Sequence, residues 1–287
     1  MFFNLKYCSN NDWFNYEPDE IFHFTKLSSF ENIMKSNALR FRKNNYSNDD
    51  RDGKIHDYLL SAINSTATYK FITNPAWDEF SKRIESFFKL YEQLNLTVKS
   101  KHTIKSLPTM YNICFSTGNS DHMWSKYGDF DKGVAIGFSK SILKRFLDYP
   151  FSNNENKYFD CTCGKIIYDE ETKNKIIEDI IINSFKEYCS LKQDLKSDCF
   201  NETLIELLIC SYFFKDEKWN LENEFRFVLI HTKDLISPEI DENENLYIQL
   251  NFNNSDDFKK YAITRLNVKC ESYLKSLSKY NINIILT

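Results

Sequence analysis

Apolar residues along this chain form two kinds of pattern, short runs that suit strands and longer runs with helical spacing. Short runs rich in β-branched and aromatic side chains, bounded by polar turn formers, predict strands. Such runs occur at 20–25, 39–41, 111–116, 133–138, 165–168, 225–230, 246–250 and 282–286. They predict a sheet built from segments that are far apart in the sequence.

Apolar residues three or four positions apart predict the helices. A short helix is expected after the first strand, and another at 139–147. Longer helical segments are expected at 55–98, with a break near 74–75, and at 171–214, where two helices would join around 197–198.

The predicted strands do not alternate regularly with helices, because the long helices fall between groups of strands. A doubly wound parallel sheet needs that alternation, so the pattern predicts an α+β fold with a split, largely antiparallel sheet. The sequence contains neither an internal repeat nor a low-complexity linker. We therefore expect a single domain over residues 1–287, with helical insertions at about 55–98 and 171–214.

Composition and charge narrow the class of protein. Hydrophobic residues make up 42% of the chain and aromatic residues 16%, which is typical of a globular protein and not of a disordered one. The net charge of −4 argues against wrapping a nucleic-acid duplex, but it allows a local basic groove. Since no segment looks like a signal peptide or a bilayer span, we expect a cytoplasmic protein without membrane contact.

The cysteines give only a weak indication of a metal site. Of the eight, only Cys161 and Cys163 lie close together, and no second Cys or His pair follows at zinc-finger spacing. We expect reduced, mostly structural thiols and no bound metal.

The first candidate for chemistry is His23, which interrupts an apolar strand between Phe22 and Phe24. A neutral imidazole offers one donor and one acceptor, which suits binding a ribose hydroxyl or a carbonyl group. A hydrogen-bonded core histidine fits the same pattern, and the residue alone does not decide between the two.

The second candidate segment follows the strand at 111–116. Ser116 lies where that strand runs into a turn, so its hydroxyl is expected at the end of the sheet. Trp124 and Tyr127 come next, three residues apart and therefore on one side of a helical turn. Two aromatic residues at this spacing fit either a core position or a platform for a planar ring.

The third segment carries Glu222, Glu224 and Arg226 at the start of a late strand. If the strand begins near Glu222, its period of two places all three on one face. Burying two carboxylates and a guanidinium is costly unless they are paired. A solvated edge with an ordinary Glu–Arg pair is the alternative.

Taken together, these segments resemble a bacterial family called domain of unknown function 2971. The shared features are His-x-Thr on an early strand, the Cys-Phe-Ser and Met-Trp-Ser-x-Tyr blocks, and a late Trp-x-x-Glu-x-Glu-x-Arg. Their order and spacing agree from about Ile21 to Ile285. The chain also has the family's Asn48-Asp49 pair, but it continues with Asp50-Arg51-Asp52 where the family usually has Pro-x-Glu.

A second resemblance, at the level of motifs, is to the ADP-ribosyltransferases. It implies a split-sheet fold and an enzyme that transfers a glycosyl group from NAD, which is a substrate and not a resident cofactor. By this resemblance His23 and Thr25 bind the ribose side of NAD, Ser116 supports the pocket, and Trp124 or Tyr127 stacks on the nicotinamide.

The same resemblance assigns the chemistry to the third segment. Glu224 is the catalytic carboxylate that stabilises the developing ribosyl cation, and Glu222 orients or deprotonates the acceptor. Arg226 is counted among the NAD-binding residues, although it has no standard role in such enzymes.

Two other functions are compatible with the sequence. A metal-dependent nuclease would use Asp49, Asp52, Glu222 and Glu224 as Mg²⁺ ligands, with Lys218 beside the phosphate. A non-catalytic module would bind a nucleotide or a partner protein in the same pocket without turnover.

The transferase interpretation also predicts partners. NAD and a macromolecular acceptor, either nucleic acid or protein, would be the substrates. Because an enzyme that consumes NAD or modifies essential targets is toxic unless restrained, we expect a toxin–antitoxin or phage-defence setting with a neutralising partner protein.

Overall fold

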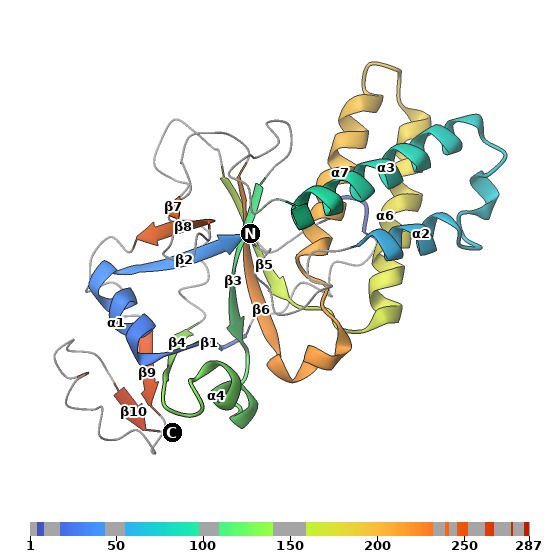
Figure 1. The fold of residues 1–287 in the computed structure, drawn as a ribbon. Coiled ribbons are helices and arrows are strands. Elements are labelled where there is room, and N and C mark those ends of the chain that lie inside the picture. Colours follow the sequence, from blue (N-terminus) through green and yellow to red (C-terminus); the bar gives the residue numbers. More distant parts are fainter. Residues whose placement is uncertain are drawn as a thin grey trace.

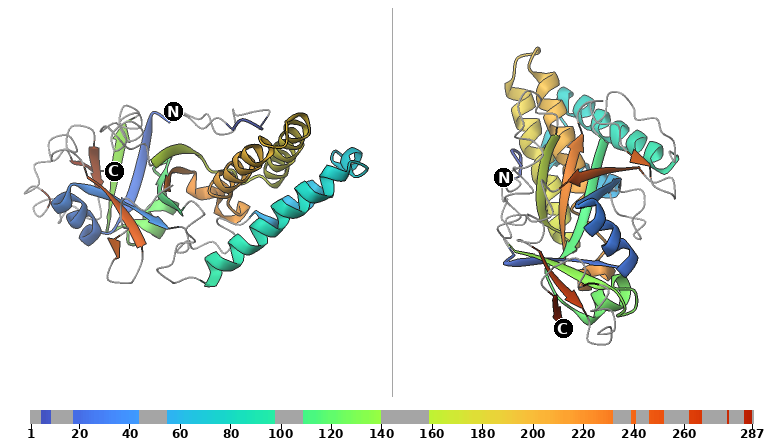
Figure 2. Two further views of the ribbon diagram at one scale, coloured as in Figure 1. Left: turned by 90° about the horizontal axis from the view of Figure 1, so that it is seen from above. Right: turned by 90° about the vertical axis from the view of Figure 1, so that its left-hand side faces the viewer.

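The structure of the protein is a computed structural model that describes residues 5–8, 18–43, 55–97, 109–139, 159–231, 239–240, 246–251, 262–266, 277 and 284–286. Strands and two short helices, α1 and α4, occupy one side of the molecule (Figure 1). The helices α2, α3, α6 and α7 extend from the other side, as the two further views also show (Figure 2). The mixture of helices with a mostly antiparallel sheet confirms the predicted α+β class.

The described strands form one ten-stranded sheet in the order β10-β9-β4-β1-β3-β2-β8-β7, with β6 paired to β3 and β5 paired to β6. All described pairs are antiparallel except β9 with β10. The strands are β1 Glu20–Thr25, β2 Ala38–Lys43, β3 Thr109–Ser116, β4 Val134–Ser139, β5 Phe159–Lys165, β6 Glu224–His231, β7 Glu239–Ile240, β8 Leu246–Asn251, β9 Ala262–Leu266 and β10 Ile284–Leu286.

The sheet divides at β3. β6 pairs with β3 along the whole strand, from Thr109 opposite His231 to Ser116 opposite Glu224. β1 pairs with β4 over its full length, but it meets β3 only where Phe22 lies opposite Ser116. β1 and β3 therefore diverge from a single point of contact, and the strands that carry His23, Ser116 and Glu224 lie side by side at that point.

Aromatic residues on one face of the sheet hold its central strands together. Phe225 and Phe227 of β6 lie on this face, and Phe227 packs edge-on against Phe115 of β3 at 5.5 Å between ring centroids. Phe115 in turn packs edge-on against Phe138 of β4. Because side chains alternate along a strand, Arg226 between the two β6 phenylalanines and Glu224 before them face the opposite side.

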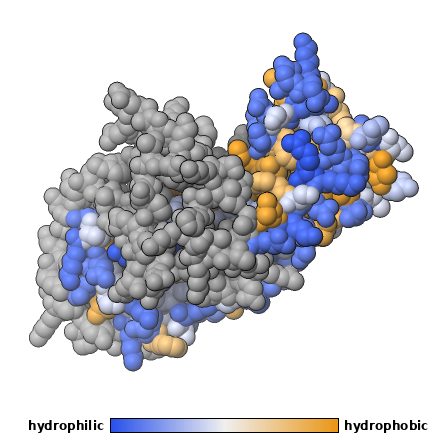
Figure 3. Space-filling view, turned by 45° about the horizontal axis from the view of Figure 1, so that its top comes forward, coloured by the Kyte–Doolittle hydropathy of each residue, from blue (hydrophilic) through white to orange (hydrophobic). Residues whose placement is uncertain are grey.

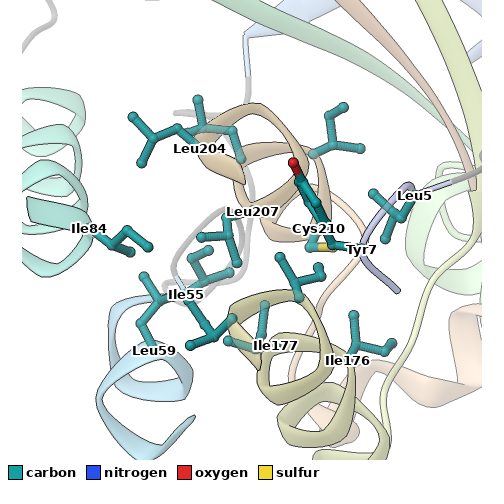
Figure 4. Close-up of a cluster of buried hydrophobic side chains, with 14 of the residues drawn as sticks. Leu5, Tyr7, Ile55, Leu59, Ile84, Ile176, Ile177, Leu204, Leu207 and Cys210 are labelled. Carbon is teal, nitrogen blue, oxygen red and sulfur yellow. The ribbon is translucent and has the colours of Figure 1, made fainter. Parts of the chain in front are cut away.

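The described helices are α1 Leu27–Ser36, α2 His56–Ile63, η2 Tyr69–Phe71, α3 Pro75–Thr97, α4 Asp121–Tyr127, α6 Glu170–Ser190, α7 Lys196–Ser211 and η3 Glu217–Glu222. The two predicted insertions pack on each other, because α6 contacts α2, α3 and α7. Figure 4 shows the core that α2, α3, α6 and α7 share. Leu5 and Tyr7 of the N-terminal segment also belong to it.

The N-terminal segment is fixed to α7 through a buried carboxylate. Glu206 accepts hydrogen bonds from the backbone N–H groups of Lys6 (2.6 Å) and Tyr7 (3.1 Å). The Lys6 side chain pairs with Glu187 and Glu202 on the neighbouring helices. Burial raises the pKa of Glu206 to about 7, against the opposing effect of the two backbone hydrogen bonds.

Several predicted element boundaries are wrong. The strand expected at 165–168 is β5, which ends at Lys165, and only Ile167 beyond it forms a β-bridge. The expected junction at 197–198 lies inside α7, since the helices break at 191–195 instead. The polar residues at 197–198 suggested a junction, but they lie on the exposed face of α7. Residues 140–147 of the expected short helix lie outside the described residues.

Among the described helices, none is long and apolar enough to cross a membrane. The helical side of the molecule displays mainly hydrophilic residues with hydrophobic ones scattered between them (Figure 3).

Candidate functional site

A buried cluster of charged side chains lies where η3 runs into β6. Lys215 is at its centre and donates to Oε2 of Glu222 (2.6 Å) and to Oε2 of Glu224 (2.9 Å). Arg226 Nε donates to the other oxygen of Glu224 (2.6 Å), and a second guanidinium nitrogen donates to the carbonyl of Tyr212 (2.7 Å). The Arg226 side chain is 1% exposed and that of Lys215 is 6% exposed. The predicted cost of burying these charges is offset by direct pairing.

The pairing fixes the protonation states of the cluster. Burial would raise the pKa of Glu224, but the charges of Arg226 and Lys215 outweigh it and lower the pKa to about 2. Burial would likewise lower the pKa of Lys215, but the Glu224 and Glu222 carboxylates outweigh it and raise that pKa. Glu224 is therefore an anion at neutral pH and Lys215 a cation.

Glu222 links this cluster to α4. Its Oε1 accepts hydrogen bonds from Lys126 Nζ (2.6 Å) and from the hydroxyl of Tyr127 (2.6 Å). Burial and the Glu222 carboxylate both raise the pKa of Tyr127, so its hydroxyl stays a proton donor. Lys126 also lies 3.4 Å above the ring centroid of Trp219, which comes from η3.

The backbone brings Glu222 to the cluster in a way that differs from the prediction. β6 begins at Glu224, and Glu222 is the last residue of η3, so strand periodicity does not align the two carboxylates. Asn223 between them is left-handed (φ 43°) and turns the chain. Ser116 Oγ holds this turn by donating to the carbonyl of Glu222 (2.8 Å).

His23 lies at the point where β1 and β3 diverge. Its Nδ1 is 3.2 Å from the carbonyl oxygen of Cys114, and because a carbonyl can only accept, Nδ1 carries a proton. Burial and the charge of Arg42 lower the pKa of His23, although the hydrogen bond opposes them. The ring is thus neutral at pH 7, and its Nε2 has a lone pair that can accept a hydrogen bond.

Cys114 connects the first and third segments. Its backbone carbonyl contacts His23, and its thiol is close enough to Glu224 to feel the charge of that carboxylate. Burial and the Glu224 charge raise the pKa of this thiol well above its usual range, so it stays protonated at neutral pH. The side chain is nevertheless exposed to solvent. Cys114 is thus a solvent-exposed residue close to Glu224.

The two aromatic residues of α4 differ in position. Trp124 is 4% exposed and packs edge-on against Phe24 of β1, with its Nε1 donating to Asn119. Tyr127 packs against the same small core but reaches the charged cluster through its hydroxyl. Of the predicted pair, only Tyr127 therefore adjoins the candidate catalytic residues, whereas Trp124 has a core position.

Thr25 lies at the end of β1, opposite Val134 of β4. The chain is tight here, since a side chain at Gly133 would bring its Cβ within 2.3 Å of the Thr25 carbonyl oxygen. This packing fixes the path of β1 just beyond His23.

Comparison with known proteins agrees with one of the predicted resemblances. Residues 123–227 match the family described as Protein of unknown function (DUF2971). This matched region is shorter than the predicted extent of about 21–285. It begins inside α4, at Met123, and includes η3 and the start of β6, and hence Lys126, Lys215 and both carboxylates, whereas His23 and Ser116 precede it. No curated protein and no solved structure matches the chain.

Within the region that matches DUF2971, the structure adds three residues to which the sequence interpretation gave no role in the site, Lys126, Lys215 and Trp219. Lys215 precedes Glu222 by seven positions in an irregular segment, and no periodicity relates them. Trp219 belongs to the Trp-x-x-Glu-x-Glu motif, which was a usable signal, but no role was assigned to it. Outside the cluster, Lys173 of α6 is fully buried and donates to the carbonyl of Lys215 (2.7 Å).

The structure describes only two of the four metal ligands that the nuclease alternative would use, Glu222 and Glu224. Asp49 and Asp52, with the Asn48-Asp49 loop, lie outside the described residues. Over the part of the chain that the structure describes, no group of three or more His, Cys, Asp or Glu side chains is arranged to hold a metal ion. Glu222 and Glu224 are engaged by lysine and arginine, which a metal ion would have to displace.

Proposed function

We propose that this protein is an NAD-dependent mono-ADP-ribosyltransferase that uses Glu224 as its catalytic carboxylate. NAD is the donor substrate, and the acceptor is a macromolecule. The proposal includes the finer assignment of the fold, a split sheet of the ADP-ribosyltransferase kind with long helical insertions. The divergence of β1 from β3 after a single residue pair supports that assignment.

The observation that carries the proposal is the meeting of three strands at one residue, since Phe22 of β1 and Glu224 of β6 both lie opposite Ser116 of β3. Three segments far apart in the sequence thus meet, and this meeting supports the proposal. In neutral His23, Nε2 can accept a hydrogen bond from a ribose hydroxyl. Tyr127, next to Glu222, is the candidate for stacking on the nicotinamide ring.

The electrostatics of Glu224 suit the reaction. The bond between the nicotinamide nitrogen and ribose C1′ breaks, nicotinamide leaves with the electron pair, and C1′ becomes cationic. An acceptor oxygen or nitrogen then bonds to C1′ and loses its proton. A carboxylate with a pKa of about 2 stays ionised beside the developing charge and stabilises it. Lys215 and Arg226 fix its orientation, so little reorganisation accompanies the reaction.

Glu222 is placed to act on the acceptor in this scheme. It ends η3 beside Glu224 and is oriented by Lys126, Tyr127 and Lys215. We retain, as part of the proposal, a cytoplasmic toxin or phage-defence role with a neutralising partner protein. Because lysine and arginine already pair with Glu222 and Glu224, a transferase explains the cluster better than a metal-dependent nuclease does.

The proposal is tested by incubating the purified protein with adenylate-labelled NAD and total cell lysate. Wild type is expected to transfer label to macromolecules in the presence of chelator, and Glu224→Gln to lose at least 100-fold of that activity, on the order of one electrostatic stabiliser. Nuclease and protease digestion identify the acceptor. Equal labelling by wild type and Glu224→Gln, or no labelling by either, contradicts the proposal.

A further inference from the structure

Two positions beside Glu222 carry residues that the fold of the described chain does not require. The first is Gly118, in the loop between β3 and α4. Its φ lies outside the left-handed range, and a Cβ added to it would meet no heavy atom of the described residues within 4 Å beyond its chain neighbours. Glycine loses more conformational entropy on folding than any other residue, so position 118 has this cost without a benefit that the described structure shows.

Gly118 borders the backbone of Glu222. Ser116 Oγ lies within hydrogen-bond distance of the carbonyl oxygens of both residues, at 3.0 Å from Gly118 and 2.8 Å from Glu222. The N–H of Thr117 donates to the carbonyl of Asn223 (2.9 Å), so the two chain segments run side by side. A glycine without a steric need at such a place is typical of a backbone that another molecule approaches closely.

The second position is Phe130, in the turn that follows α4. Asp129, Phe130 and Asp131 are all left-handed, with φ of 51°, 54° and 67°. Aspartate tolerates this conformation, whereas a phenylalanine is strained in it. Phe130 is also 79% exposed, so burial within the chain does not offset the strain. Strain of this kind is common at binding sites.

The Phe130 turn also lies beside the candidate site. Tyr127, three residues earlier, donates its hydroxyl proton to Glu222 (2.6 Å). The turn is tied back to α4, because the N–H of Asp131 donates to the carbonyl of Trp124 (3.3 Å). Gly118 and Phe130 therefore belong to the two connections that lead into and out of α4, the helix that contacts Glu222.

We propose that Gly118 and Phe130 contact the acceptor and that the acceptor is a protein. The proposal rests on the transferase function, because Glu222 is the residue that would act on the acceptor. An exposed aromatic side chain is typical of protein–protein contacts, and bare backbone at Gly118 allows a polypeptide to approach closely.

A nucleic-acid strand fits this surface less well. Its phosphates would approach the aspartates on either side of Phe130, where like charges repel. Lys126 and Lys218 already pair with carboxylates, and Lys132 follows the second aspartate. A protein segment is therefore the acceptor class that the surface favours.

The acceptor surface is tested with adenylate-labelled NAD at saturating concentration and increasing amounts of total cell lysate. Gly118→Ala adds one methyl group to the bare backbone, and Phe130→Asn removes the ring but keeps a residue that tolerates the left-handed conformation. Tyr69→Asn is the matched control, because Tyr69 is another exposed aromatic residue (73%) and lies in η2, on the helical side of the molecule. Thermal unfolding is measured for each variant.

We expect Gly118→Ala to raise Tm by roughly 1–4 °C and Phe130→Asn to leave Tm at or above the wild-type value. Both variants should need roughly tenfold more lysate for half-maximal labelling, as for an interface contact, with the maximal rate and the KM for NAD unchanged. Tyr69→Asn should label like wild type. Protease, and not nuclease, should release the label.

Four results would overturn the proposal while leaving the transferase function in place, because wild type transfers label in each. Half-maximal labelling at the wild-type lysate concentration in either variant shows that the residue does not contact the acceptor. A raised KM for NAD shows that it contacts the donor. A lower Tm for Gly118→Ala shows that glycine is needed by the fold, and release of the label by nuclease identifies a nucleic-acid acceptor. If wild type transfers no label, the proposed function fails and the acceptor surface fails with it.

Discussion

Replacing Lys215 with Met should strongly destabilise the protein, because Lys215 is the one described cation that contacts both carboxylates. Its ammonium group lies 2.6 Å from Glu222 and 2.9 Å from Glu224, and all three side chains are at most 6% exposed. Removing one partner of a buried ion pair typically costs about 3–5 kcal/mol, since the remaining charge is left without compensation. For a chain of this size that corresponds to roughly 6–20 °C in Tm.

The loss should also depend on pH. The pKa of Glu224 is depressed to about 2 in the folded protein, so its ionised form contributes stability above its ordinary pKa of 4.5, and this contribution is lost as pH falls towards 2. Without Lys215 the Glu224 pKa rises, and the variant has less of this stability to lose. The difference in free energy of unfolding between Lys215→Met and wild type should therefore narrow from pH 7 to pH 3.

Denaturant unfolding followed by circular dichroism measures both effects. Lys218→Met is the control, because its side chain is 58% exposed and its nearest carboxylate contact is 3.7 Å, so it should change the free energy of unfolding by less than about 1 kcal/mol. Equal unfolding midpoints for Lys215→Met and Lys218→Met at pH 7 would refute the reasoning about the buried cluster.

Two further predictions concern contacts outside the cluster. Lys173→Met should lower the free energy of unfolding by about 1–3 kcal/mol, because it leaves the Lys215 carbonyl without its donor. Lys175→Met, at an exposed position of the same helix, should have almost no effect. Equal values for the two variants in denaturant unfolding would contradict this prediction. The raised pKa of Glu206, about 7, means that the folded protein binds more protons than the unfolded one between pH 4.5 and 7, so stability should fall as pH rises through that range, by up to about 3 kcal/mol. Glu206→Gln should remove this decline, and an unchanged pH profile would show that Glu206 does not titrate there.

Periodicity predicted the elements well where one face of a segment is buried. The β-favouring residues around His23 predicted the strand at 20–25, and the structure has β1 at these bounds with Ile21, Phe22 and Phe24 buried. The helix break at 74–75 is also correct, because proline begins α3. The boundary at 165–168 failed because Ile166 and Ile167 are buried by the helices and not by strand pairing.

The candidate site was predicted in part. Glu222, Glu224 and Arg226 stood out because charged residues in an apolar setting need partners, and the structure supplies those partners. Lys215 could not be predicted in this way, since a turn at left-handed Asn223 and the fold of η3 bring it to the carboxylates. Short-range patterns carry no information about such contacts between irregular segments.

His23 shows a different limit. The sequence allowed both a core residue and a binding residue, and the structure shows a hydrogen bond to the β3 backbone, which leaves Nε2 as the acceptor nitrogen. The tautomer follows from the contact with the Cys114 carbonyl, which only the paired strands define.

The measurement that tests the central claim most directly is the stoichiometry of bond cleavage in NAD. Purified protein is incubated with the identified acceptor and NAD labelled separately in the nicotinamide and in the adenylate. The account predicts one free nicotinamide for each ADP-ribose bound to the acceptor with wild type, and neither product with Glu224→Gln. Intact NAD after incubation with wild type, or equal cleavage by Glu224→Gln, would contradict it.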